Sequence, residues 1–192
     1  MKKKIVYMAV LCILLSLLAN GTLAYFTAED TARNVITTGK VDIVIEEWQQ
    51  TENGLEKYPS EPIAIMPATT VSKIVTVKNL DAECFIRARL DMIVKDLEGN
   101  VMKIEPEMLE KIITLNMNTA NWTYRDGWWY CNNAVKNGKA TEALMTEVVF
   151  DGPNMTNEYQ NCTVEIHVNA QAVQSANNKT TVLEAKGWPE EE

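Results

Sequence analysis

Apolar and polar residues alternate along several segments of this chain, and this period of two is the feature that most limits its fold. The alternation is clearest in residues 41–46, 85–94 and 164–172. Successive side chains of a β-strand point to opposite faces, so a strand of this pattern buries one face and exposes the other. We therefore predict a β-strand in each of the three segments.

Further segments continue this pattern, and turn residues separate the segments. The further predicted strands are residues 71–78, 112–117, 128–131, 146–150 and 180–185. Pairs such as Asn53-Gly54 and Asp126-Gly127 favour tight turns between strands. Many short strands separated by turn residues predict an all-β fold, a jelly-roll or Ig-like antiparallel β-sandwich. Helix is expected only in a signal-peptide helix and in one turn at residues 106–111, which Pro106 can begin.

The first 24 residues have the layout of a secretory signal peptide. Three lysines at positions 2–4 precede an apolar run at residues 5–18, and small side chains follow. That run is shorter than the roughly 20 residues of a membrane span. We predict cleavage between Ala24 and Tyr25, with an uncleaved N-terminal anchor as the alternative. The mature protein is then secreted, and the only expected membrane contact is that of the precursor, through its uncleaved signal peptide.

The mature chain is expected to be one acidic domain. Residues 25–36 are interpreted as a mobile N-terminal segment, residues 37–186 as the β-sandwich domain, and residues 187–192 as a frayed acidic tail. Removal of the signal peptide takes away three lysines and no acidic residue, so the net charge of −8 becomes about −11. A surface of this charge repels nucleic acid and anionic membranes. Nucleic-acid binding is therefore excluded.

Three cysteines remain after export, and an odd number cannot all pair within one chain. They are Cys84, Cys131 and Cys162. One disulfide with one free thiol is possible, with Cys131 and Cys162 as the candidate pair, and so is the absence of any disulfide. Buried apolar cysteines without a function are a further interpretation.

The sequence offers little support for catalysis. The single histidine, His167, lies on the polar face of the predicted strand at residues 164–172. A zinc protease of the usual kind needs two histidines one helical turn apart, and a nucleophile with a histidine base needs a partner that no motif here supplies. We predict no enzymatic activity, no catalytic residue, no metal site and no cofactor, and we interpret His167 as a surface residue.

Aromatic residues gather around the predicted Asp126-Gly127 turn. They are Trp122, Tyr124, Trp128, Trp129 and Tyr130. Exposed aromatic faces can stack on sugar rings, which would make this hairpin a glycan-binding platform. Aromatic residues are also common in strands, where they fill a core or cover its edge, and this is the interpretation we favour.

Four segments in the same order resemble the TasA/camelysin family of secreted proteins. They are GTLAYFT at residues 21–27 with NVITTGKVDI at 34–43, VTVKNL with FIRA at 75–80 and 85–88, DGWWY at 126–130, and IHVNAQAVQ at 166–174. Members are matrix and cell-surface proteins of Gram-positive bacteria, exported through a SipW-type signal peptidase. The family's jelly-roll sandwich agrees with the strands predicted from alternation.

The resemblance implies that this chain is a structural protein of an extracellular biofilm matrix or of the cell surface. In the related fibres, an N-terminal strand freed by signal cleavage completes a sheet of the next subunit. Residues 25–36 would then be the donor segment, with Phe26, Val35 and Ile36 as anchors. Expected partners are further copies of the chain, the signal peptidase and other matrix proteins. Camelysin-like proteolysis and a monomeric adhesin that binds glycan are the alternatives.

Overall fold

The computed structural model describes residues 41–59, 67–156, 159 and 162–189. These residues all belong to one compact unit of the chain. The predicted signal peptide, its cleavage site at Ala24 and Tyr25, and the donor-strand anchors Phe26, Val35 and Ile36 lie outside the described residues. None of the described helices has the length and apolar character needed to cross a membrane.

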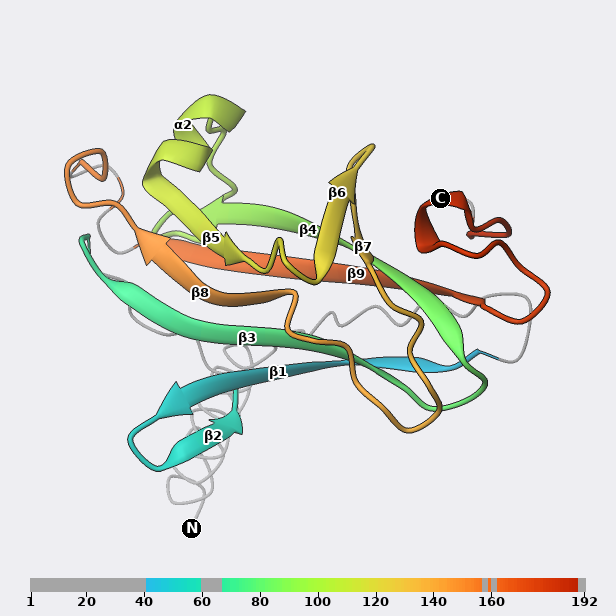
Figure 1. The fold of residues 1–192 in the computed structure, drawn as a ribbon. Helices are drawn as coiled ribbons and strands as arrows, with labels where there is room; N and C mark the ends of the chain where they lie inside the picture. The colour runs from blue at the N-terminus through green and yellow to red at the C-terminus, as the bar shows by residue number, and fades with distance from the viewer. Residues whose placement is uncertain (1–40, 60–66, 157–158, 160–161, 190–192) are drawn as a thin grey trace, which may run out of the picture. The chain divides into compact units, whose positions relative to one another are not determined.

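The described chain consists mainly of β-strands (Figure 1). One short α-helix, α2 (Pro106–Ile112), and one 3₁₀ turn, η2 (Val182–Glu184), interrupt them. The strands are β1 (Ile43–Thr51), β2 (Gly54–Lys57), β3 (Thr70–Asn79), β4 (Cys84–Lys95), β5 (Ile113–Met117), β6 (Trp122–Arg125), β7 (Trp128–Cys131), β8 (Met145–Phe150) and β9 (Thr163–Gln174). The all-β prediction is confirmed, and so are the three long alternating strands, which became β1, β4 and β9.

The strands form two antiparallel sheets that pack as a sandwich. The five-stranded sheet has the order β2-β1-β3-β8-β5, and the four-stranded sheet has the order β6-β7-β4-β9. Residues of both sheets meet in one hydrophobic core. Val75 and Val77 of β3 and Ile86 and Ala88 of β4 are fully inaccessible to solvent in this core. Burying a valine or isoleucine side chain stabilises the fold by about 1.5–3 kcal/mol, so this apolar face holds the sheets together.

Two hairpins supply strands that alternation did not predict. β1 turns into β2 through Glu52 and Asn53, so that Gly54 of the predicted Asn53-Gly54 turn becomes the first residue of β2. β6 turns into β7 at Asp126-Gly127. Both residues of the second turn have positive φ, 51° for Asp126 and 83° for Gly127, as a two-residue hairpin loop of type I′ requires. The turn residues were recognised in the sequence, but β2 and β6 have only four residues each, too few for a clear alternation.

The strand predicted at residues 180–185 is wrong. The chain forms η2 there, because the Asn178 side chain fixes a compact loop instead of an extended strand. Its Oδ1 accepts hydrogen bonds from the backbone N–H groups of Lys179 and Lys186, and its Nδ2 donates to the carbonyl of Lys186. Val182 is thereby buried against the outer face of the four-stranded sheet.

Candidate functional site

The longest open edge in the described structure belongs to β9. Its twelve residues pair with β4 along their whole length, from Cys84 with Gln174 to Lys95 with Thr163. β9 ends the four-stranded sheet, so no described strand pairs with its other edge. An edge of this kind presents backbone N–H and C=O groups to which another strand can bind.

The opposite sheet extends further than β9 does. β1 contacts β9 across the sandwich, and β2 pairs with the far edge of β1. The five-stranded sheet therefore continues by one strand beyond the position of β9. Val164 and Ile166 point toward the core from β9 but are only half-buried at this edge. A strand added to β9 would lie opposite β2 and would cover these two side chains.

The outer face of β9 carries a polar network. Glu165 accepts a hydrogen bond from Lys95 of β4, and its second oxygen lies 3.2 Å from Nε2 of His167. Burial raises the pKa of Glu165, but the hydrogen bonds from Lys95 and His167 outweigh it, so that the pKa is lowered overall. His167 is also directly opposite Asp91 of β4. The histidine thus lies on the polar strand face, where the alternation placed it, among carboxylates.

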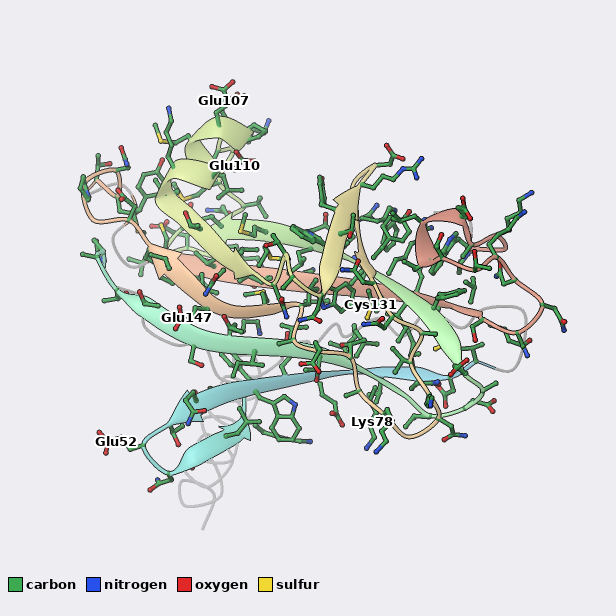
Figure 2. All side chains as sticks on the ribbon, viewed as in Figure 1. Glu52, Lys78, Glu107, Glu110, Cys131 and Glu147 are labelled. Carbon is green, nitrogen blue, oxygen red and sulfur yellow. The ribbon has the colours of Figure 1, made fainter. Side chains whose placement is uncertain are left out.

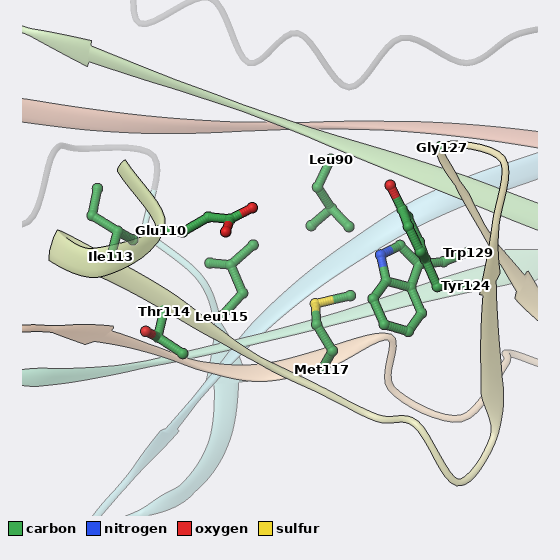
Figure 3. Close-up of a pocket in the computed structure, with 9 residues that line it drawn as sticks. All are labelled: Leu90, Glu110, Ile113, Thr114, Leu115, Met117, Tyr124, Gly127 and Trp129. Carbon is green, nitrogen blue, oxygen red and sulfur yellow. The ribbon is translucent and has the colours of Figure 1, made fainter. Parts of the chain in front are cut away.

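A groove of about 400 Å³ opens between the two sheets on the other side of the sandwich (Figure 3). Leu115 and Met117 of β5 and Leu90 of β4 provide an apolar floor. Tyr124 of β6 and Trp129 of β7 form one wall, with ring centres 5.1 Å apart and planes tilted by 48°. Glu110, Ile113, Thr114 and Gly127 complete the lining. Both β5 and β6 are end strands of their sheets, so the groove follows the open edges of the sandwich.

One carboxylate enters this groove. Glu110 of α2 projects into it from the end opposite the aromatic wall (Figure 3), and Glu107 projects from the same helix (Figure 2). No described hydrogen bond or ion pair engages Glu110. An apolar groove with a few converging polar groups is the usual form of a ligand site.

The aromatic hairpin divides its side chains between two faces of the sheet. Trp122 is buried in the sandwich core and Trp129 lines the groove, whereas Tyr124 is 59% exposed. Trp128 and Tyr130 instead face outward into a second cluster. The prediction that these aromatics fill the sandwich core or cover its edge therefore holds for part of the hairpin only.

The second cluster is closed by the C-terminal segment, residues 175–189. Arg87 lies between two indole rings, 4.1 Å from the centre of Trp128 and 4.7 Å from that of Trp188. Its guanidinium also donates hydrogen bonds to Gln171 and to the hydroxyl of Tyr130. Trp188 of the predicted tail therefore packs onto the sheet, whereas residues 190–192 lie outside the described residues.

The candidate disulfide between Cys131 and Cys162 is not formed. None of the three described cysteines, Cys84, Cys131 and Cys162, forms a disulfide within the described part of the chain. The residue before Cys131 pairs with Arg87, whereas the residue after Cys162 pairs with Lys95. At about 3.3 Å per residue these positions lie roughly 25 Å apart along β4. A disulfide requires Cα atoms within about 7 Å, so the β4 ladder keeps the two cysteines apart.

Sequence reasoning missed the groove, although it had singled out two of its residues. Tyr124 and Trp129 belong to the aromatic group noted in the sequence, and Leu115 and Met117 lie in a predicted strand. Nothing in the linear order indicated that these segments face each other across an open side of the sandwich. Comparison with protein-family models, with curated proteins and with solved structures finds no match to this chain.

Proposed function

We propose that this protein is a secreted structural component of an extracellular matrix, a subunit of protein fibres or an accessory to them. The observation that carries the proposal is the open twelve-residue edge of β9 beside a wider opposing sheet. A long unpaired edge invites aggregation, and natural proteins normally shorten, charge or cover such edges. Strand addition from another copy would cover this edge and would use it for assembly.

The N-terminal segment is the proposed donor. Residues 25–36 equal β9 in length, and their apolar residues Phe26, Val35 and Ile36 would anchor them. Backbone hydrogen bonds to β9 would supply affinity, and side chains inserted beside Val164 and Ile166 would supply register. A contact from the N-terminus of one copy to β9 of the next is head-to-tail, so it does not close on itself and grows a filament.

Resemblance to the TasA/camelysin family supports this assignment. The resemblance also implies that a Gram-positive bacterium secretes the protein and that a SipW-type signal peptidase processes it. Cleavage after Ala24 would free the donor segment, so export and assembly would be coupled. We further propose that the sandwich is a jelly roll. Its neighbouring strands β3 with β8 and β4 with β9 are antiparallel partners far apart in sequence, as long jelly-roll connections require.

Electron microscopy of the purified mature chain, residues 25–192, tests the proposal over a range of concentrations. Fibres are expected from the mature chain and not from a variant that lacks residues 25–33. Val164→Lys should also prevent fibres, because it places a charge on the inward side of the β9 edge. The matched control is Val149→Lys, which makes the same exchange at an exposed position of β8.

Circular dichroism and thermal melting establish that each variant is folded. Fibres from the shortened chain would refute the donor role of the N-terminal segment. Normal fibres from folded Val164→Lys, or their equal loss in Val149→Lys, would refute the role of the β9 edge. A mature chain that stays monomeric at every concentration would refute self-assembly itself.

A further inference from the structure

We infer that the free edge of β5 and the groove beside it form a second docking site, which binds an extended basic strand of a different protein. This site is separate from the proposed assembly edge. β5 and β6 end their sheets on one side of the sandwich, whereas β2 and β9 end them on the other. A partner strand at β5 and a donor strand at β9 can therefore be bound at the same time.

The backbone of β5 provides the first part of the site. β5 pairs with β8 on one side only, through Ile113 with Phe150, Thr114 with Val149 and Leu115 with Val148. Its other edge faces no strand within the described residues. A peptide in extended conformation can therefore add to β5 as a sixth strand and gain main-chain hydrogen bonds.

The groove provides positions for alternate side chains of such a strand. Every second residue of an added strand would point into the space between the sheets. There it would meet the floor of Leu90, Leu115 and Met117, which are only half-buried, and the wall of Tyr124 and Trp129. Two apolar side chains two residues apart would exclude water from this surface. A sugar ring would contact the aromatic wall but would leave the edge of β5 unpaired.

The charge of the groove indicates that a basic peptide binds there, and the net charge of this chain indicates that the peptide belongs to another protein. The carboxylate of Glu110 points along the groove without a described partner, and Glu107 lies on the same helix (Figures 2 and 3). A lysine or arginine at the end of the strand would pair with Glu110. Residues 25–36 of this chain carry Glu29 and Asp30 against one arginine, and the whole chain has a net charge of −8. The occupant is therefore a basic strand from a different protein.

Two synthetic peptides probe the site on the full mature chain. Both are eight residues long with alternating valine and threonine between their ends, one with lysine at both ends and the other with glutamate. Isothermal titration calorimetry and tryptophan fluorescence should show the lysine peptide binding about fivefold more tightly, as expected for a partly solvated charge pair. Glu110→Gln should remove most of this preference, whereas the control Glu98→Gln, at an exposed turn, should leave it unchanged.

The backbone requirement is tested separately. N-methylation of alternate amides of the lysine peptide should abolish binding if the methyl groups face β5. The variant Met117→Lys should also abolish peptide binding, and it should leave fibre formation unchanged. Equal binding of both peptides, unchanged binding after N-methylation in either register, or no peptide binding at all would overturn the inference. Binding of cellohexaose instead of the peptides would identify the groove as a glycan site. None of these outcomes depends on whether β9 accepts a donor strand.

Discussion

The guanidinium of Arg87 lies 4.7 Å from the centre of the Trp188 indole ring, so one stacking contact attaches the end of the chain to the outer face of the four-stranded sheet. Trp188 also meets Tyr130 edge to face at 5.9 Å. Together with Val182, Trp188 packs against the face of the sheet that carries Phe85, Trp128 and Val173. The C-terminal segment thus covers one side of the sandwich.

Replacement of Trp188 should loosen this cover. We expect Trp188→Ala to lower the free energy of unfolding by about 2 kcal/mol, because it removes a cation–π contact and an aromatic pair. Trp188→Phe should retain part of the stability. Urea unfolding measures both, with Leu183→Ala, an exposed position of η2, as the control. Equal small effects of Trp188→Ala and Leu183→Ala would show that the stacking contributes little.

Lys73 is a buried charge whose partners hold it in place. Its Nζ donates to Oε2 of Glu47 at 2.7 Å and lies 3.9 Å from the ring centre of Tyr58. Lys73→Ala should destabilise the protein by about 3 kcal/mol, because the Glu47 carboxylate is left partly buried without its cation.

The double variant Lys73→Met with Glu47→Leu should recover most of that loss, since no unpaired charge remains. Chemical denaturation of the single variants Lys73→Met and Glu47→Leu and of the double variant gives the coupling energy. Additive losses in the double variant would mean that the two side chains do not act as a pair.

Gly127 is required by the turn that positions the groove wall. Its φ of 83° is unfavourable for residues with a Cβ atom, although no neighbour would obstruct that atom. Gly127→Ala should therefore cost about 1 kcal/mol from backbone strain alone. The near-ultraviolet circular dichroism of the Tyr124 and Trp129 pair should change with it. An unaltered spectrum together with unaltered stability would contradict this account of the turn.

The cysteines should differ in reactivity and in their effect on stability with pH. Burial, with smaller contributions from Cys131 and Glu83, raises the pKa of the Cys84 thiol from 9.0 to about 12. Burial also raises the pKa of Cys131, whereas Cys162 is only half-buried. N-ethylmaleimide followed by mass spectrometry should modify Cys162 first in the folded protein.

The sign of the pH effect follows from the raised pKa of Cys84. The folded protein keeps this proton at a pH where the unfolded chain releases it, so the contribution to stability is complete below about pH 9 and is lost as the pH rises toward about 12. Cys84→Ala should reduce this loss when unfolding is followed between these pH values. A slope that is the same with and without the thiol would assign the loss to other groups.

Local patterns anticipated much of the fold, because the information they carry lies within a few residues. Alternation located β4 and β9 nearly to the residue, and the Asp126-Gly127 pair marked the turn between β6 and β7. The strand that alternation predicted at residues 180–185 is wrong. There the packing of Val182 against the four-stranded sheet and the hydrogen bonds of Asn178 determine the conformation. β6 was too short to stand out and became a strand only by pairing with β7.

The sequence by itself determined that the chain is built of strands with one apolar face, and it determined which turns separate them. The order of strands in the two sheets arose only in the tertiary structure, because β4 with β9 and β3 with β8 pair across long stretches of chain. That order left β9 and β5 at open edges, placed Tyr124 and Trp129 beside Leu115, and kept Cys131 away from Cys162. Contacts between segments distant in sequence depend on how the buried faces of the two sheets pack together, which no short pattern specifies.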